Sequence, residues 1–306
     1  MRTAFIKTLL DLAAEDDRIW LATGDLGYAV LEPFRDQFPD RFVNVGVAEQ
    51  NMTGVAAGLA STGRVVFTYS IANFPTLRCF EQIRNDVCYH NLPVKIVSVG
   101  AGFTYGPHGY THHGLEDVGT MRTLPGMTIV APGDPFETQL AVRALVQQPG
   151  PCYLRLGKAG EPEVHRSPPP FTIGRAITVR DGNDVTIITA GGLLEHSVET
   201  ADRLLAESGI NARVLSMHTI KPLDIDAVAK AARETGGIVT IEEHSIVGGL
   251  GSAIAEVVAS LEQPYGFFQS LAAPDELHHR IGSASYMREM IGDLFHTVLH
   301  AVESRI

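Results

Sequence analysis

The feature that most constrains the fold of this 306-residue chain is an alternation of short apolar runs with longer stretches of helical spacing. The runs Val94–Val99 and Cys152–Leu156 have the length and apolar content of strands that are buried on both faces. Between such runs, Glu49–Ala60 and residues 134–148 repeat apolar side chains at helical spacing. This order predicts βαβ units, in which helices cover both faces of a parallel sheet, and therefore the α/β class.

The alternation stops once, in a segment rich in proline. Glu161-Pro-Glu163 and Ser167-Pro-Pro-Pro170 favour a stiff, extended connection rather than a helix or a central strand. We therefore expect a linker at residues 161–180. A length of 306 residues also suits two domains. The prediction is two doubly wound α/β domains, at residues 1–160 and 181–306, of which the second is smaller.

Composition excludes several classes of protein. The net charge of -11 argues against a nucleic-acid-binding surface, which needs a basic face. No apolar run reaches the length of a membrane span, and the first residues lack the pattern of a signal peptide. The three cysteines, Cys79, Cys88 and Cys152, form no C-x-x-C pair, so a disulfide framework or a zinc site is not expected. A cytoplasmic protein is the expectation.

One stretch in the first domain has neither strand nor helix periodicity. Residues 100–114 are rich in glycine, histidine and tyrosine, and irregular segments of this length inside α/β units usually serve function. His108, His112 and His113 could suggest a metal site, but their spacing fits metal ligands on a helix poorly. We therefore expect a loop whose histidines take part in binding or proton transfer rather than in metal binding.

Glu49 stands at the end of a predicted strand and the start of an apolar helix. Two interpretations are open from the residues themselves. An acidic residue at this position favours the helix dipole and may only cap the helix. The carboxyl ends of parallel strands are also where α/β folds bind ligands. A carboxyl beside Val47, Ala48 and Met52 would be poorly solvated, which favours a shared proton.

The run Val45-Gly-Val-Ala-Glu-Gln-Asn-Met52, with Gly24-Asp-Leu26 upstream, resembles the pyrimidine-binding domain of transketolases. The resemblance implies that Glu49 is catalytic and binds the cofactor thiamine diphosphate, because the matching glutamate hydrogen-bonds N1′ of the aminopyrimidine. It likewise implies that Asp25 is the acidic residue near the cofactor at a subunit interface.

A second resemblance covers Tyr69 to Asp86. In transketolases this region supplies the aromatic ring that stacks on the aminopyrimidine, and such stacking adds about 1 kcal/mol beyond burial. Phe74 is the expected ring and Arg78 an expected cofactor contact. Tyr69 and Phe80 remain alternatives, and core packing is an equal possibility for each ring taken alone.

A third resemblance places substrate contacts in the irregular loop. Pro107-His-Gly-Tyr-Thr-His-His-Gly-Leu-Glu-Asp117 is similar to the Asp-Gly-Pro-Thr-His-Gln loop of transketolases. The resemblance implies that His112 is catalytic and contacts the donor carbonyl and sugar hydroxyls, with His113 beside it. His108 stands where the family has an aspartate that reads a sugar hydroxyl. Arg155 corresponds to the arginine that binds substrate phosphate, although a surface salt bridge is the alternative from the residue alone.

The second domain carries its own resemblance. Ile220-Lys-Pro-Leu-Asp224 and the run from Glu242 to Gly251 resemble the C-terminal domain of transketolases, deoxyxylulose-phosphate synthases and keto-acid dehydrogenase β chains. That domain mainly supports dimerisation. Together the four resemblances cover nearly the whole chain.

One part of a complete enzyme has no counterpart in the sequence. The diphosphate-binding domain of the family is marked by Gly-Asp-Gly followed by Asn, which hold Mg²⁺, and no such pair occurs here. The resemblance therefore implies one subunit of a split transketolase, with the Mg²⁺ and diphosphate ligands on a partner subunit and an α2β2 assembly. The implied reaction is transfer of a two-carbon ketol unit from a ketose (phosphate) donor to an aldose (phosphate) acceptor, within carbohydrate metabolism.

Three departures from the family pattern bear on the substrate. His108 replaces the aspartate, Ala29 replaces a phosphate-binding serine, and Gly100 stands where a phosphate-contacting histidine is expected. A substrate other than the usual pentose phosphates follows from these differences. Other functions stay open at this point: a deoxyxylulose-phosphate synthase-like chain, the β subunit of a 2-oxo-acid dehydrogenase, or a non-catalytic assembly subunit.

Overall fold

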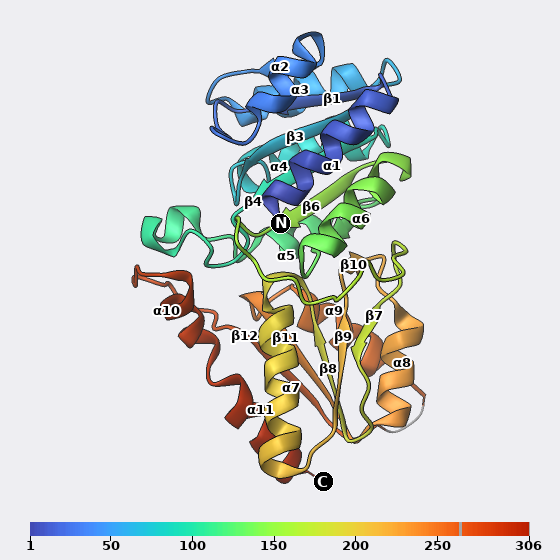
Figure 1. Cartoon of the computed structure of the whole chain (residues 1–306), viewed down its shortest axis with the longest axis vertical. Coiled ribbons are helices and arrows are strands. Elements are labelled where there is room, and N and C mark those ends of the chain that lie inside the picture. The colour runs from blue at the N-terminus through green and yellow to red at the C-terminus, as the bar shows by residue number, and fades with distance from the viewer. Residues whose placement is uncertain (263–264, 306) are drawn as a thin grey trace.

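The structure, a computed structural model, describes residues 1–262 and 265–305. It confirms the α/β class: two sheets flanked by helices lie one above the other along the long axis of the molecule (Figure 1). The second expected domain, at 181–306, includes residues 263, 264 and 306, which lie outside the described residues.

The first domain is built around a seven-stranded sheet in the order β10-β5-β6-β4-β3-β1-β2, in which β10 is antiparallel to β5 and the remaining pairs are parallel. Strands of this sheet such as β4 and β6 are buried along their whole length, which explains their continuous apolar runs. Its elements are α1 (Arg2–Glu15), β1 (Ile19–Thr23), α2 (Glu32–Gln37), β2 (Phe42–Asn44), α3 (Glu49–Ala60), β3 (Val65–Ile71), α4 (Phe80–Gln82), β4 (Val94–Val99), α5 (Asp117–Arg122), β5 (Thr128–Val130), α6 (Pro135–Gln147) and β6 (Cys152–Leu156).

The second domain contains a five-stranded sheet in the order β12-β11-β8-β9-β7, with only the β7–β9 pair antiparallel. Strand β7 lies within the segment expected to be a linker, so this segment ends in regular structure. The elements are β7 (Ile177–Arg180), β8 (Val185–Thr189), α7 (Leu194–Ser208), β9 (Ala212–Ser216), β10 (Thr219–Lys221), α8 (Ile225–Glu234), β11 (Ile238–Ser245), α9 (Leu250–Ala259), β12 (Phe268–Ala273), α10 (Ala284–Arg288) and α11 (Leu294–Glu303).

Two helices expected from spacing are divided in the structure. The helix expected over residues 76–89 is a 3₁₀ turn, the short α4 and a π-helix at Ile83–Cys88. The helix expected over residues 286–302 is interrupted at Gly292, whose φ of 96° lies outside the helical region and suits glycine. Helical spacing predicted the buried side chains correctly in both places but did not reveal these local changes in backbone.

The two domains share one hydrophobic core. A single cluster of buried side chains joins Ile96 and Ile129 of the first sheet to Ile188 and Leu215 of the second. Strand β10 strengthens this connection, because it belongs to the second domain in sequence but pairs with β5 of the first. The carboxyl ends of the first sheet's strands are therefore held in a constant position relative to the second domain.

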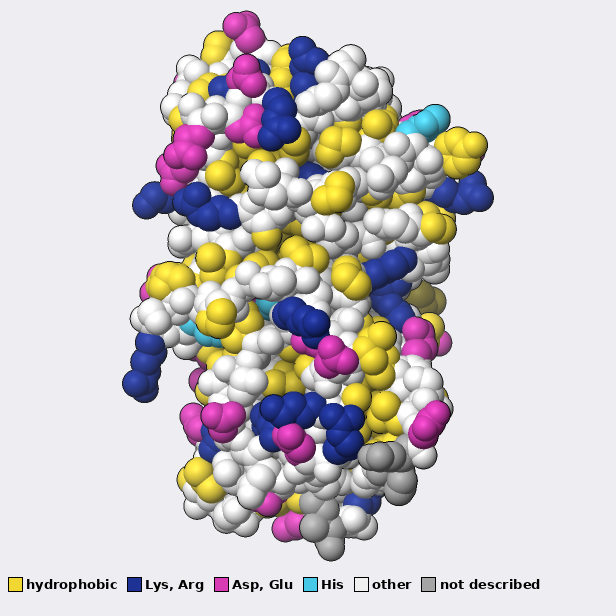
Figure 2. Space-filling model, turned by 90° about the vertical axis from the view of Figure 1, so that its right-hand side faces the viewer, with side chains coloured by type: hydrophobic (Ala, Val, Ile, Leu, Met, Phe, Trp, Pro, Cys, Tyr) yellow, Lys and Arg dark blue, Asp and Glu magenta, His cyan; other side chains and the backbone are white. Residues whose placement is uncertain are grey.

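The surface agrees with the acidic composition. On the face shown in Figure 2, hydrophobic side chains spread across the middle of the molecule, and basic side chains lie among acidic ones rather than in a continuous patch. Within residues 1–262 and 265–305, none of the helices is both long and apolar enough to cross a membrane.

Candidate active site

Glu49 is the first residue of α3 and lies at the carboxyl end of the parallel strands. Its side chain is only 1% exposed. Ser70, near the end of β3, donates a hydrogen bond to Oε1 at 3.2 Å, and Arg78 forms an ion pair with Oε2 at 2.7 Å. Gly24, after β1, fits closely against this carboxyl, since a Cβ at that position would lie 3.3 Å from Cγ of Glu49. The acid is thus buried, oriented and, in the free chain, paired.

Asp25 occupies the same strand end in a left-handed conformation, with φ of 58°. Its carboxylate accepts hydrogen bonds from Asn44 Nδ2 at 3.0 Å and from the Tyr28 hydroxyl at 3.3 Å. Asn44 in turn accepts the backbone N–H of Asp25 at 3.1 Å. The side chain of Asp25 is exposed, so it lies at the rim next to Gly24 rather than inside the site.

Phe74 lies beside Glu49 through Arg78, whose guanidinium carbon is 4.7 Å from the centre of the Phe74 ring. The ring of His112 meets Phe74 edge to face, with centroids 5.3 Å apart. Of the two alternative rings, Tyr69 is 2% exposed and stacks on Phe5 in the core, and Phe80 packs on the core cluster. The structure therefore places Phe74, rather than either alternative, between Glu49 and the histidine loop.

The irregular stretch is a closed loop. Gly102 and Gly114 pair as an antiparallel bridge, and the chain between them forms two 3₁₀ turns, at Gly106–His108 and Tyr110–His112. The turns bring the ring of His108 to 5.1 Å from that of His112, between centroids. Two of the three loop histidines therefore lie side by side near Phe74.

His112 is set up to act as a neutral ring. Partial burial lowers the pKa of His112, and the neighbouring His108 lowers it further. The hydroxyl of Thr111 lies 2.9 Å from Nδ1 of His112. If Thr111 donates to Nδ1, the proton of the neutral ring is on Nε2, where it can be donated to a substrate oxygen.

The structure corrects the expectation for His113. Its side chain has no exposed surface and packs edge to face on Phe103, with ring centroids 5.3 Å apart. Burial lowers the pKa of His113, and among the described residues neither ring nitrogen has a hydrogen-bond partner. A ring in this position cannot reach a substrate, so we propose that His113 packs the inside of the loop.

Arg155 also differs from the expectation of a phosphate ligand. It is 5% exposed, and its Nε forms an ion pair with Asp117 at 2.7 Å. Its Nη2 donates to the carbonyl oxygens of Gly114 and Glu243. Burial by itself would raise the pKa of Asp117, but the charge of Arg155 outweighs it, so that the pKa is lowered. Because two of its nitrogens are committed inside the protein, we propose a structural role for Arg155.

Sequence reasoning missed two residues of the site. Ser70, which donates to Glu49, and Tyr105, whose ring lies 5.7 Å from that of His108 and 6.4 Å from that of His112, were not expected there. The position of Ser70 at a strand end was a usable signal. That of Tyr105 was not, because it depends on how the loop folds.

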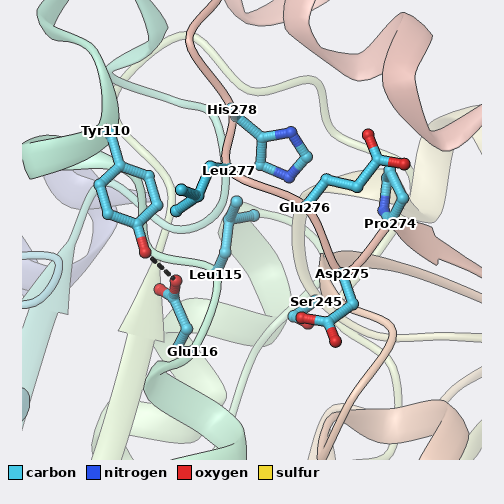
Figure 3. Close-up of a pocket in the computed structure, with 9 residues that line it drawn as sticks. All are labelled: Tyr110, Leu115, Glu116, Ser245, Pro274, Asp275, Glu276, Leu277 and His278. Carbon is cyan, nitrogen blue, oxygen red and sulfur yellow. Dashed lines mark hydrogen bonds between the residues drawn. The ribbon is translucent and has the colours of Figure 1, made fainter.

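A separate hollow of about 200 Å³ lies beside the loop (Figure 3). Tyr110 and Glu116, joined by a hydrogen bond of 3.0 Å, line one side, and the segment from Pro274 to His278 lines the other. Glu116, Asp275 and Glu276 give the hollow an acidic lining, which does not suit a phosphate group.

The arrangement combines a buried carboxyl, an aromatic face and a neutral imidazole at one edge of a parallel sheet. This set fits the aminopyrimidine end of thiamine diphosphate, because the carboxyl can hydrogen-bond a ring nitrogen and the aromatic face can stack. Among the described residues, no three histidine, cysteine, aspartate or glutamate side chains gather as a metal site.

Comparison with known proteins identifies the family. Residues 1–161 match the model of the transketolase pyrimidine binding domain, and residues 174–292 match that of the transketolase C-terminal domain. A subunit of the apulose-4-phosphate transketolase of Phocaeicola vulgatus is 43% identical over 277 residues, which cover 90% of this chain and 88% of the relative. A 1-deoxy-D-xylulose-5-phosphate synthase of Heliobacterium modesticaldum is 38% identical, over 94% of this chain but 44% of that protein.

A solved structure is similar over almost the entire chain. It is described as a split gene transketolase, inactive beta4 tetramer, and it aligns with a TM-score of 0.88 and 38% identity over 99% of this chain and 97% of its own. Both the relative of matching length and this structure are single subunits of transketolases divided between two chains. The chain therefore belongs to the transketolase family and is of the type of the C-terminal, or β, subunit of a split transketolase.

Proposed function

We propose that this chain is the pyrimidine-binding subunit of a thiamine-diphosphate-dependent transketolase that transfers a two-carbon ketol unit from a ketose to an aldose. The observation that carries the proposal is the buried carboxyl of Glu49, oriented by Ser70 and Gly24 at the carboxyl edge of the sheet. An acid that only capped α3 would not need this fitted surrounding on three sides.

When bound, the cofactor supplies a carbon nucleophile and stabilises negative charge on the transferred unit. Glu49 would hydrogen-bond the aminopyrimidine and move a proton at that ring nitrogen. Phe74 would present its face to the same ring, and Arg78 would release Oε2 of Glu49 to make room. Each of these steps uses a side chain whose position is described above.

His112 would act on the sugar. Its neutral ring can donate from Nε2 to the donor carbonyl oxygen as charge develops there, and can take a proton back from a hydroxyl. His108, exposed and beside it, would contact a sugar hydroxyl. The relative named for apulose-4-phosphate supports a sugar phosphate as substrate.

We infer that a second subunit supplies the Mg²⁺ and diphosphate ligands. Support comes from the described residues, which form no cluster of metal ligands, and from the solved structure described as an inactive tetramer of β subunits. An α2β2 assembly would place each cofactor between the two kinds of subunit. The thiols of Cys79, Cys88 and Cys152 are free, which supports a reducing compartment such as the cytoplasm.

The other candidate functions receive less support. The deoxyxylulose-phosphate synthase is matched over 44% of its length, so that reaction resides in a chain more than twice as long. A non-catalytic assembly subunit would have no use for Glu49, Phe74 and His112 placed together at the strand ends.

The test is a calorimetric titration of thiamine diphosphate with Mg²⁺ into this chain alone, and then into its mixture with a diphosphate-binding subunit from the same source. We expect binding and ketol transfer only in the mixture. Glu49→Gln should lower the ketol transfer rate by about 10²–10⁴-fold, as loss of a general acid–base group does, whereas the exposed His90→Gln should not. Full turnover by the chain alone, or an active Glu49→Gln variant, would contradict the proposal.

A further inference from the structure

The second domain reaches directly into the loop that carries His108 and His112. In Figure 1 the loop, in the green-blue part of the colour scale, extends from the first domain and lies above α10 of the second. Gly106 in the loop fits against the carbonyl of Gly282, because a Cβ on Gly106 would lie 2.5 Å from that oxygen. The loop is thus in contact with a domain expected mainly to support dimerisation.

The main connection is the side chain of Glu243, at the carboxyl half of β11. Its Oε1 accepts the backbone N–H of Phe103 at 2.7 Å, at the start of the loop. Its Oε2 accepts from Nε of Arg288, on α10, at 2.9 Å. Both oxygens are used, and the side chain is 4% exposed. A buried charged acceptor of this kind makes a strong hydrogen bond and leaves a large penalty when it is removed.

The sequence of the loop is adapted to this carboxylate. Gly102 has φ of +59°, and a Cβ there would lie 2.3 Å from Cγ of Glu243. The same Gly102 pairs with Gly114 to close the loop. Nη2 of Arg155 donates both to the carbonyl of Gly114 and to that of Glu243. The beginning and the end of the loop are therefore fastened to one residue of the second domain.

We propose that Glu243 is a positioning residue of the active site, which sets the place of His112 by anchoring the loop through the Phe103 amide and Gly102. The inference rests on the proposed function for its kinetic consequence. Its structural part, that Glu243 orders the loop, is independent of the reaction. A displacement of about 1 Å at a catalytic group can cost on the order of a hundredfold in rate, so an anchor of this kind matters for turnover.

The neighbouring Glu242 offers a matched control. It is equally buried, at 4% exposed, and its two oxygens accept the N–H groups of Leu250 and Gly251, each at 2.7 Å. Both partners belong to α9 of the second domain. Removing Glu242 therefore takes away a buried carboxylate with two hydrogen bonds but leaves the loop contacts in place.

The structural experiment is hydrogen exchange by mass spectrometry on the chain by itself. Glu243→Ala should raise the exchange of the Phe103 amide and of the peptide covering residues 100–114 by about tenfold, the ratio expected from a lost charged hydrogen bond. Glu242→Ala should change exchange at the start of α9 and not in the loop. If Glu243→Ala does not fold, Glu243→Gln is compared with Glu242→Gln in the same way. Unchanged loop exchange, or equal loop exchange in the two members of a pair, would overturn the proposal.

The kinetic experiment uses the complex with the diphosphate-binding subunit. Glu243→Ala should lower kcat for ketol transfer by about 10–100-fold, with cofactor affinity kept within about twofold. Glu243→Gln keeps an acceptor for the Phe103 amide and should recover most of the loss, and Glu242→Ala should retain the kcat of the unaltered complex. A fall in cofactor affinity in place of kcat, or no recovery in Glu243→Gln, would refute the positioning role. A complex that transfers no ketol unit even unaltered would instead refute the proposed function and leave the exchange result standing.

Discussion

Nη1 of Arg78 lies 2.7 Å from Oε2 of Glu49, so the proposed catalytic acid is already paired before a cofactor arrives. Arg78 keeps 46% of its side-chain surface exposed, whereas that of Glu49 is 1% exposed. The pair is therefore open on the side of the arginine, which can swing away while Glu49 stays in place. This relationship joins the stability of the free chain to the binding of the cofactor.

Removal of the arginine should weaken the free chain. In Arg78→Met the Glu49 carboxylate would stay buried with Ser70 as its remaining side-chain partner, and the free energy of unfolding should fall by about 1–3 kcal/mol. Urea denaturation measures this change. Arg18→Met is the control, because the Arg18–Asp16 pair is more exposed and should change stability by about 1 kcal/mol or less. Equal losses in the two variants would mean that Arg78 has no special part in holding Glu49.

Acid sensitivity should trace in part to His113. Burial lowers the pKa of His113 in the folded chain, so the unfolded chain takes up the proton first as pH falls below about 6.5. Stability is therefore lost on acidification, by at most about 1.4 kcal/mol per pH unit for this one group. His113→Phe should reduce the fall in stability between about pH 6.5 and 5.

The measurement is urea denaturation at a series of pH values. Part of the slope should persist in His113→Phe, because burial lowers the pKa of His112 and His218 as well, while His165 acts in the opposite sense beside Glu137. Phenylalanine suits the site because it packs against Phe103 and the two ring nitrogens it replaces have no described partner. A slope identical to that of the unaltered chain would show that His113 is not a source of the acid sensitivity.

The buried pair of Asp117 and Arg155 should be essential to stability. Asp117→Asn leaves the guanidinium without its counter-charge, and the expected loss is about 3–5 kcal/mol. Arg155→Met should cost a similar amount, and the double variant should cost less than the sum because both changes break one interaction. Thermal or urea denaturation tests this. Glu207→Gln, in an exposed pair with Arg203, should stay within about 1 kcal/mol.

His108 should control the choice of sugar. It is exposed beside His112 and replaces the aspartate of the family loop, so His108→Asp should change the ratio of kcat/KM between two aldose acceptors by about tenfold. The ratio is measured in the reconstituted complex with a hydroxylated acceptor and its deoxy analogue. His90→Asp, also exposed, should leave the ratio unchanged. An unchanged ratio in His108→Asp would remove this residue from the specificity of the enzyme.

The sequence by itself determined the class of fold and the identity of several site residues. Strand and helix periods are local properties, so Glu49–Ala60, Val94–Val99 and Cys152–Leu156 were predicted with the bounds that the structure shows. The order of the motifs likewise indicated the family that the comparisons confirm. These features needed no knowledge of which segments lie together in space.

Tertiary structure alone decided what each site residue contacts. The bonds of Arg78 to Glu49, of Arg155 to Asp117 and of Phe103 to Glu243 join residues that are 29, 38 and 140 positions apart. Such contacts depend on strand register and on how the loop closes, which local periodicity does not encode. The sequence therefore offered Arg155 and His113 as ligands, and packing placed them in the interior, because a buried charge or ring is stable only where its neighbours complete it.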